Sequence, residues 1–300
     1  MARCLVTGHR GYIGSHLYAQ LQELGHDVRG IDAKPDAPGN KGHNILQVLK
    51  EYEDGSGRFH PYFYDFKPEY VFHMACVPRV AHSVAHPVQT MENNVLCTSY
   101  VLNFARKVGA KRVIYSGSSS VVGDGNGPNS PYGLQKLISE MECKLYSGLY
   151  GLDTVSLRYF NVYSADQEAE GAYPTAIANF MACIRSNHRP FITGTGEQRR
   201  DMAHVKDVVA ANIFAMNSET NFNGAQFDVG TGSNISLNEI KNIVLDYFPK
   251  VNFQYIEERT GDVLYTQANI LPLSDAGWTP SVGIQQGINE CFRDLKDELE

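Results

Sequence analysis

Short apolar runs alternate with longer segments of helical periodicity through the first half of the chain. The apolar runs that predict buried strands are residues 3–8, 27–32, 69–75, 111–117 and 153–162. The segments with apolar residues at helical spacing, which predict amphipathic helices, are residues 13–25, 92–109 and 133–148. Because strands separated by helices of this length need right-handed crossovers, the pattern predicts an α/β fold with a doubly wound parallel sheet.

This rhythm changes after about residue 162. Residues 172–187 predict a helix, and residues 189–216 predict a strand, a turn and a further helix. Another helix is predicted at 236–248, opened by a capping box of Ser236 and Glu239. The sequence has no internal repeat and no Pro- or Ser-rich linker long enough to separate independent domains.

Composition narrows the class of protein. With 300 residues, 43% of them hydrophobic, and a formal charge of −7, the chain resembles a soluble globular protein rather than a nucleic-acid binder. No apolar window reaches the length of a membrane span, and the N-terminus has no signal-peptide pattern. The six cysteines are scattered singly, which is typical of reduced thiols and favours a cytoplasmic location. His82 and His86 lack the further ligand that a metal site needs, so no metal is predicted.

A glycine loop follows the first predicted strand directly. Gly8, Gly11 and Gly14 stand where the chain must turn tightly from strand to helix and let a pyrophosphate approach the backbone. Asp32 ends the second predicted strand, where a carboxylate can bind the ribose hydroxyls of an adenosine. Because this carboxylate would repel a 2′-phosphate, the pattern favours NAD over NADP.

Tyr132 and Lys136 are four residues apart, which stacks a phenol and an ammonium on one helix face. About one such pair is expected by chance in a chain of this composition, so the spacing alone also fits an ordinary half-buried tyrosine. The surrounding motifs decide between the two interpretations. In order along nearly the whole chain they are TGHRGYIG, VFHMA, NNVLCTSYVL, YSGSSSVVGD, PYGLQK, RYFNVYS, GTGEQRRDMAHVKD and ERTGDV.

On these motifs the chain resembles the extended short-chain dehydrogenase/reductase family, specifically its nucleotide-sugar epimerases and dehydratases. The resemblance implies NAD as the cofactor and Ser118, Tyr132 and Lys136 as the catalytic set, with Tyr132 as the base. It implies cofactor contacts from Gly8, Gly11, Tyr12, Ile13, Gly14, Asp32, Asn44, Ile45, Met74, Ala75, Asn94, Ser116, Tyr132, Lys136 and Tyr159. It implies substrate contacts from Arg79, Ser118, Ser119, Asn161, Arg200, Arg259, Asp262 and Thr266.

The same resemblance implies an organisation for the whole protein. A Rossmann-type domain is expected at 1–162, with 203–232 returning to it, and a smaller substrate lobe at 163–202 and 233–300. A homodimer is expected through helices 92–108 and 133–148. The implied partner is a nucleotide sugar, with neither a membrane nor a nucleic acid involved.

Two serines favour epimerisation over dehydration. Family members that eliminate water carry an acidic pair after the catalytic hydroxyl, whereas this chain has Ser119 and Ser120. Epimerisation at carbon 4 through a 4-keto sugar needs no such pair, and it is the predicted reaction. Thr266 replaces a bulky tyrosine of some relatives, so a UDP-hexose and a UDP-N-acetylhexosamine are both expected to fit. The alternatives are a reductase, a non-standard dehydratase, or a non-catalytic NAD-binding regulator.

Overall fold

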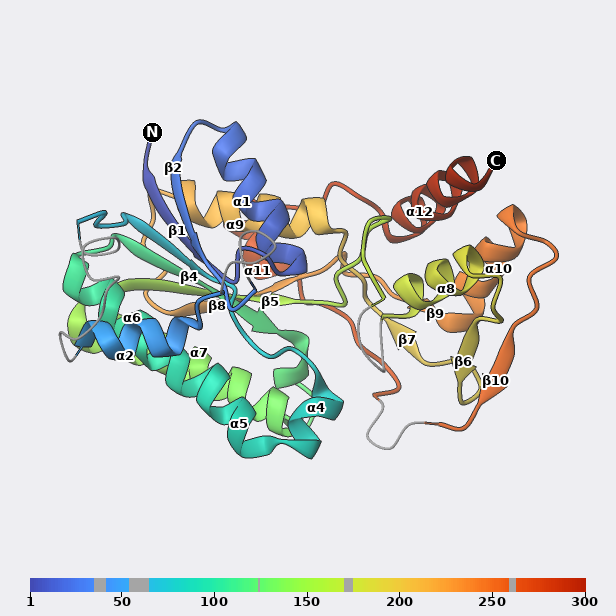
Figure 1. Cartoon of the computed structure of the whole chain (residues 1–300), viewed down its shortest axis with the longest axis horizontal. Coiled ribbons are helices and arrows are strands. Elements are labelled where there is room, and N and C mark those ends of the chain that lie inside the picture. Colours follow the sequence, from blue (N-terminus) through green and yellow to red (C-terminus); the bar gives the residue numbers. More distant parts are fainter. Residues whose placement is uncertain (35–41, 54–64, 124, 170–174, 259–262) are drawn as a thin grey trace. The chain divides into compact units, whose positions relative to one another are not determined.

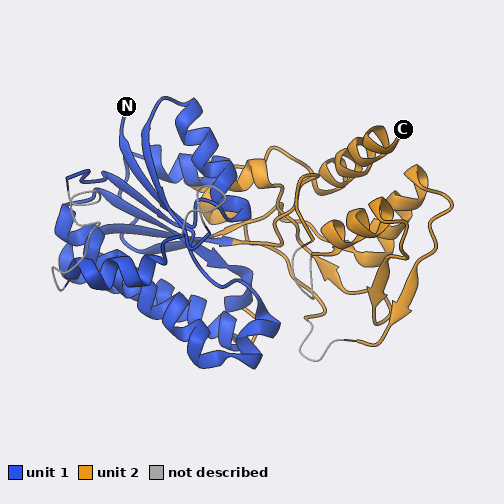
Figure 2. Cartoon of the chain, in the orientation of Figure 1, with its two compact units in different colours: residues 1–121, 128–158, 209–227 blue, residues 122–127, 159–208, 228–300 orange. Residues whose placement is uncertain are grey.

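The computed structural model describes residues 1–34, 42–53, 65–123, 125–169, 175–258 and 263–300. Their contacts form two compact units (Figure 2). Unit 1 comprises residues 1–121, 128–158 and 209–227, and unit 2 comprises residues 122–127, 159–208 and 228–300. The domain limits expected from the sequence stay a prediction.

A six-stranded sheet dominates unit 1, in the order β2-β1-β3-β4-β5-β8 (Figure 1). Its strands are β1 (Arg3–Thr7), β2 (Asp27–Ile31), β3 (Tyr70–His73), β4 (Arg112–Ser118), β5 (Asp153–Tyr159) and β8 (Ala225–Val229). The β1–β2, β1–β3 and β3–β4 pairs are parallel, and four of the five residues of β1 are buried. The predicted α/β fold with a doubly wound sheet is confirmed. From β1 the chain first adds β2 on one side and then β3 on the other, so the direction of strand order reverses between β1 and β3. In such a sheet the ligand crevice lies at the carboxyl ends of the strands at this point.

Helices cover both faces of this sheet. They are α1 (Tyr12–Glu23), α2 (Ile45–Glu53), α4 (Val80–Ala85), α5 (Pro87–Met91), a π-helix (Glu92–Leu96), α6 (Cys97–Val108), α7 (Pro131–Tyr150) and α9 (Val205–Asn217). Figure 1 draws α1 and α9 on one face and α2, α6 and α7 on the other. Gly25 has a positive φ of 77° directly after α1, so it is the predicted helix stop.

Two helices differ from the expected ones. The helix expected at 92–109 starts with a π-helical turn around Asn94 and continues an earlier helix, α5. Hydrophobic periodicity did not reveal this turn, because a single π-turn adds only one residue, too small a change to recognise in a short apolar pattern. α7 starts at Pro131 rather than 133, because Ser130 caps it and proline fits the first helical position. Tyr132 therefore lies inside the helix.

Unit 2 packs helices around a second apolar core. Its elements are α8 (Ala176–Arg185), β6 (Phe191–Thr193), β7 (Arg199–Arg200), β9 (Ile235–Ser236), α10 (Leu237–Tyr247), β10 (Gln254–Ile256), α11 (Leu271–Asp275) and α12 (Ile284–Leu299). The predicted capping box is confirmed, since Ser236 and Glu239 bond each other's backbone N–H at 3.1 and 2.7 Å. The sequence analysis missed α12, whose residues Ile288, Phe292 and Leu295 are fully buried at helical spacing.

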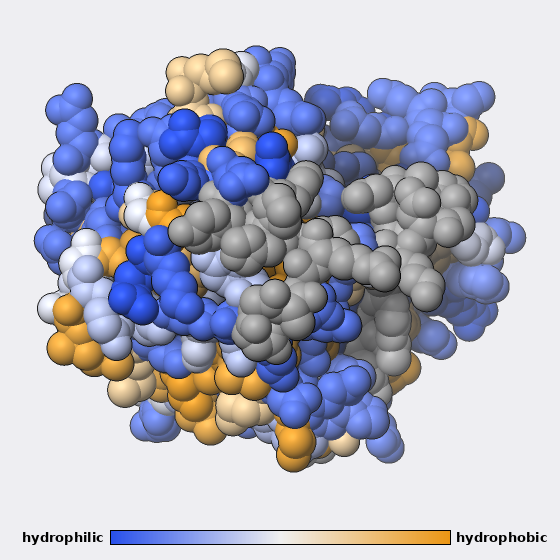
Figure 3. Space-filling view, turned by 60° about the vertical axis from the view of Figure 1, so that its left-hand side comes forward, coloured by the Kyte–Doolittle hydropathy of each residue, from blue (hydrophilic) through white to orange (hydrophobic). Residues whose placement is uncertain are grey.

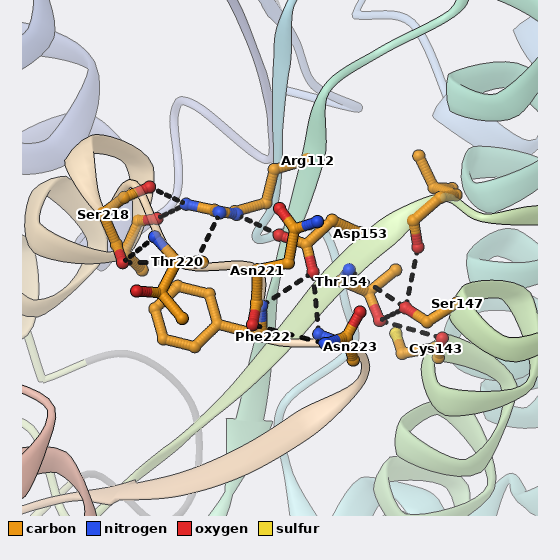
Figure 4. A network of polar contacts seen from close by, with 12 residues as sticks. Arg112, Cys143, Ser147, Asp153, Thr154, Ser218, Thr220, Asn221, Phe222 and Asn223 are labelled. Atoms are coloured by element: carbon orange, nitrogen blue, oxygen red, sulfur yellow. Dashed lines mark hydrogen bonds and ion pairs between the residues drawn. The ribbon is translucent and has the colours of Figure 1, made fainter.

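A buried ion pair joins the amino ends of β4 and β5 (Figure 4). Arg112 Nε donates to Asp153 Oδ2 at 2.5 Å, and both side chains are 6% exposed. The remaining guanidinium nitrogens donate to the carbonyl oxygens of Ala215, Ser218 and Thr220 at 2.5, 3.0 and 2.9 Å. Arg112 thereby fixes the segment after α9 against the sheet, and it leaves no side-chain nitrogen without an acceptor.

Within the described ranges, no helix is both long and apolar enough to cross a membrane, and no three metal-binding side chains gather.

Candidate active site

The glycine loop lies between β1 and α1 and is packed against the end of β3. Gly8 has a positive φ of 71°, and a Cβ there would lie 2.8 Å from the Ala75 backbone. A Cβ on Gly14 would lie 2.0 Å from the Gly8 carbonyl oxygen. Only glycine fits at both positions, so the loop holds the start of α1 close to the strand ends.

The start of α1 suits a phosphate group. Gly11 is its N-cap residue, and in the part of the chain that the structure describes no side chain caps this helix. Tyr12, Ile13 and Gly14 form the first turn, whose backbone N–H groups and dipole favour an anion. These residues therefore fit the pyrophosphate of a dinucleotide.

Asp32 follows β2 with its carboxylate fixed by two backbone donors. Oδ2 accepts from Arg10 N at 2.9 Å, and Oδ1 accepts from Lys34 N at 2.8 Å. Each oxygen keeps a lone pair for a further donor, as the two hydroxyls of a ribose require. Arg10 belongs to the glycine loop, so the carboxylate and the predicted phosphate site are held together.

Asn44, Ile45 and Asn94 are three further predicted cofactor contacts of unit 1. Asn44 Oδ1 accepts from Gln47 N at 3.3 Å and thereby caps α2, while the Ile45 side chain is buried. Asn94, in the π-helix, accepts from Val77 N at 2.7 Å and fixes the chain just after Met74 and Ala75.

His73 ends β3 inside a directional hydrogen-bond network. Thr98 Oγ1 donates to the Asn94 carbonyl oxygen at 2.6 Å, so it can accept only from His73 Nε2, at 3.0 Å. This fixes the proton on Nε2, and Thr7 Oγ1 then donates to His73 Nδ1 at 2.8 Å. Burial, with the nearby charge of Lys136, lowers the pKa of His73 to about 3, so the ring stays neutral.

Tyr132 and Ser118 meet at the carboxyl end of β4. Ser118 is the last residue of that strand, and its hydroxyl lies within hydrogen-bonding reach of the phenol of Tyr132. Burial raises the pKa of Tyr132, the neighbouring Cys76 adds to the rise, and the Ser118 hydrogen bond and the Arg79 charge oppose it. Ser120 lies behind Ser118, with the two hydroxyl oxygens 2.5 Å apart.

Lys136 lies one helical turn after Tyr132 on the same buried face of α7. The side chain is almost fully buried, and Nζ donates to the Ser116 carbonyl oxygen at 2.6 Å. Ser116 Oγ in turn donates to the His73 carbonyl oxygen at 2.8 Å. Nζ lies 5.9 Å from the centre of the Tyr132 ring, so the ammonium and the phenol are neighbours, as the spacing predicted.

The remaining predicted contacts of unit 1 flank this pair. Arg79 is the N-cap residue of α4, and Ser119 starts the short 3₁₀ helix after β4 and is half-buried. No carboxylate occupies position 119 or 120. The predicted catalytic set and the glycine loop are thus gathered at the carboxyl ends of β1, β3 and β4.

Unit 2 holds Tyr159, a predicted cofactor contact, and the remaining predicted substrate contacts among the described residues. Tyr159 is buried, Asn161 Nδ2 donates to the Asp201 carbonyl oxygen at 2.7 Å, and Arg200 Nη1 donates to the Arg199 carbonyl oxygen at 3.0 Å. Thr266 is half-buried, and its hydroxyl oxygen has no hydrogen-bond partner among the described residues. Arg259 and Asp262 lie outside the described residues. Arg199, by contrast, forms an ion pair with Glu239 at 2.8 Å.

Asp201, which the sequence did not single out, joins the loops of unit 2 that carry Asn161 and Thr266. Its carboxylate is fully buried and accepts hydrogen bonds from the backbone of Thr231, Gly232 and Ala268 at 2.8, 2.9 and 3.0 Å. Asn161 adopts a positive φ of 36°, which a non-glycine residue keeps only when its surroundings fix it. Asp201 therefore fixes the loops that present Asn161 and Thr266.

The family model described as "NAD dependent epimerase/dehydratase family" matches residues 4–230. The chain belongs to this family. It is 32% identical to a putative UDP-glucose 4-epimerase of Methanocaldococcus jannaschii, over 98% of both chains. It is also 27% identical to a UDP-N-acetyl-alpha-D-glucosaminuronate decarboxylase of Bacillus cytotoxicus, over 99% of both chains.

Solved structures agree with this assignment. The UDP-glucose 4-epimerase of Thermotoga maritima, with UDP-glucose, gives a TM-score of 0.88 at 28% identity, over 99% of this chain and 100% of that one. The UDP-N-acetylglucosamine 4-epimerase of Methanobrevibacter ruminantium, with UDP-N-acetylmuramic acid, gives 0.85 at 28% identity over 99% of both. NAD is therefore the cofactor that the family and the glycine loop both indicate.

Proposed function

We propose that the protein is an NAD-dependent 4-epimerase of a UDP-sugar. The observation that carries the proposal is the cluster of Ser118, Tyr132 and Lys136 at the strand ends beside the glycine loop, with serines at 119 and 120. The relatives include 4-epimerases and a decarboxylase, so the family alone does not choose the reaction.

The cluster supplies the groups that an alcohol oxidation needs. Tyr132 takes the proton of the carbon-4 hydroxyl, while Ser118 donates a hydrogen bond to the same oxygen. Bound NAD supplies an acceptor for the hydride of carbon 4 and returns it. Two cations favour the phenolate: the Arg79 charge, which opposes the rise in the pKa of Tyr132, and the buried Lys136 ammonium, 5.9 Å from the ring centre. Each pKa unit of such stabilisation corresponds to about 1.4 kcal/mol.

Epimerisation requires the 4-keto sugar to turn over and receive hydride on its other face. No acid or base besides Tyr132 is needed for that step, because the phenol returns its proton to the new hydroxyl. Elimination of water would need a carboxylate near carbons 5 and 6, and Ser119 and Ser120 cannot supply one. The residue types of this cluster therefore favour epimerisation over dehydration.

Thr266 supports a broad choice of sugar. The resemblance aligns it with a position where a large side chain restricts the pocket, and threonine leaves more room. Its hydroxyl oxygen is buried and has no hydrogen-bond partner among the described residues, which leaves one acceptor and donor of this position unused. We therefore propose that UDP-hexoses and UDP-N-acetylhexosamines are both substrates.

The test is incubation of the protein with UDP-Glc, UDP-Gal, UDP-GlcNAc and UDP-GalNAc, followed by mass spectrometry and NMR. Inversion of carbon 4 at unchanged mass supports the proposal. A product that has lost water identifies a dehydratase, and a reduced sugar identifies a reductase. NAD binding without any turnover identifies a regulatory protein. Tyr132→Phe should lower kcat at least a hundredfold and leave NAD binding within about twofold, since general acid–base catalysis contributes roughly 10²–10⁴-fold.

We also propose a homodimer through helices 92–108 and 133–148. Met141, Leu145 and Leu149 on α7 are each more than half exposed. Figure 3 shows hydrophobic residues gathered along the lower edge of that view. Such an apolar patch is typical of a protein interface. Leu145→Glu should give a monomer of 33.3 kDa in light scattering, whereas Leu271→Glu on α11 should leave the dimer intact; a wild-type monomer contradicts this proposal.

A further inference from the structure

The first turn of α7 has two backbone donors that need acceptors from outside the helix. Pro131, its first residue, has no N–H group. Gly133 N donates to Ser130 Oγ at 3.2 Å, which is an ordinary local cap. Tyr132 N donates instead to Ser83 Oγ at 3.0 Å, and Ser83 lies 49 residues earlier in the chain. The backbone of the proposed base is therefore held by a different helix, α4.

Ser83 is committed to this contact. It is fully buried, and its hydroxyl donates to the Val80 carbonyl oxygen at 2.7 Å within α4. Because that bond uses the only proton of the hydroxyl, the oxygen can only accept from Tyr132 N–H. The two bonds leave Ser83 no alternative partner within this geometry, so α4 and the start of α7 are fixed in one register.

We propose that Ser83 is a positioning residue for Tyr132, an inference that rests on the proposed function. Ser118 lies beside the phenol at one end of Tyr132, and Ser83 holds its backbone N–H at the other. A residue in the first turn of a helix moves readily when its N–H loses its acceptor, because few other bonds hold it. Small displacements of a catalytic group lower the rate steeply, up to about a hundredfold for 1 Å.

A pair of matched variants tests this role. Ser83→Ala removes the acceptor of Tyr132 N, and Ser130→Ala removes the acceptor of Gly133 N at the same helix end. With the best sugar of the panel, Ser83→Ala should lower kcat about tenfold and change KM less than twofold. Ser130→Ala should lower kcat less than threefold, and Ser83→Thr should recover most of the loss. Equal losses in the two alanine variants, or a change in KM alone, overturn the proposal.

A second measurement does not depend on turnover. In protein labelled with 3-fluorotyrosine, the ¹⁹F resonance of Tyr132 is assigned by its absence from Tyr132→Phe. It should shift or broaden in Ser83→Ala and stay unchanged in Ser130→Ala. If wild type turns over no sugar, the proposed function fails, and this resonance still decides the role of Ser83. An unmoved resonance in Ser83→Ala overturns the proposed positioning role of Ser83. If Ser83→Ala does not fold, Ser83→Cys is measured in its place.

Discussion

Replacing Arg112 with methionine would remove the centre of the buried network at the amino ends of β4 and β5. The substitution keeps a long apolar stem but leaves Asp153 Oδ2 without its charged donor. It also leaves the carbonyl oxygens of Ala215, Ser218 and Thr220 without the bonds at 2.5 to 3.0 Å that Arg112 now supplies. Breaking a buried ion pair in this way costs about 3–5 kcal/mol of unfolding free energy.

This cost translates into a measurable shift in Tm. At about 2.1 cal/mol/K per residue, the unfolding entropy of a 300-residue chain is about 0.6 kcal/mol/K. A loss of about 4 kcal/mol therefore lowers Tm by about 6 °C in a calorimetric scan. Arg106→Met is the matched control, because Arg106 is exposed and stacks on the Tyr150 ring at 4.9 Å; it should cost less than about 1 kcal/mol.

Two further outcomes check the reasoning. The double variant Arg112→Met/Asp153→Asn should lose less than the sum of its single variants, because neither charge is then left buried alone. The kcat of folded Arg112→Met should stay within twofold of wild type, since six strand steps of about 3.3 Å put Ser118 roughly 20 Å away. A Tm change like that of Arg106→Met, or additive losses, would show that the network contributes little.

Two other predictions concern the predicted cofactor site. The pKa of His73 is about 3 in the folded chain, against 6.5 ordinarily, so the unfolded chain binds an extra proton below pH 6.5. The free energy of unfolding that depends on the neutral His73 is nearly complete at pH 7 and falls by about 2 kcal/mol as the pH is lowered to 5. In urea titrations at pH 7 and pH 5, His73→Gln should therefore lose about 2 kcal/mol less between the two pH values than wild type does. Gly30→Ala would place a Cβ 2.3 Å from the ring of His9, a residue of the glycine loop. The ring must move, and the loop with it, so we expect NAD binding measured by calorimetry to weaken at least tenfold. Gly148→Ala, whose Cβ meets nothing within 4 Å, should bind NAD normally, and equal affinities in the two variants would refute the argument.

The parts of the fold that local spacing specifies could be predicted from the sequence. The glycines of 8–14 span the turn from β1 into the start of α1, and Tyr132 and Lys136 lie one helical turn apart within α7. Helix α7 could have been placed at 131, since serine followed by proline is a helix-start signal. Similarly, Asn44 before an apolar run gave a signal for α2.

The partners of these residues could not be predicted, because they depend on tertiary contacts. Nothing in the segment around Ser83 indicates that its hydroxyl accepts from Tyr132 N, 49 residues later. The spacing of His82 and His86 raised the question of a metal site. The residue of this segment that makes a long-range contact is instead the buried Ser83, which lies between them. Asp201 likewise binds the backbone of residues 30 and 67 positions away. Such bonds follow from the fold, and no sequence periodicity reports them.

Stability and proposed chemistry lie at opposite ends of β4. Near its carboxyl end lie groups from β3 and α7 whose ionisation is affected by burial: a His73 kept neutral, a Lys136 ammonium on a carbonyl oxygen, and a Tyr132 whose pKa burial raises. The amino end carries Arg112, with an acceptor for each of its nitrogens. In a parallel sheet the carboxyl ends of all strands lie along the same end of the sheet, and ligand-binding groups gather there. The end of the sheet that holds the amino ends is then free to carry rigid anchors. A fully bonded anchor at one end can therefore offset the cost of burying polar and charged groups at the other.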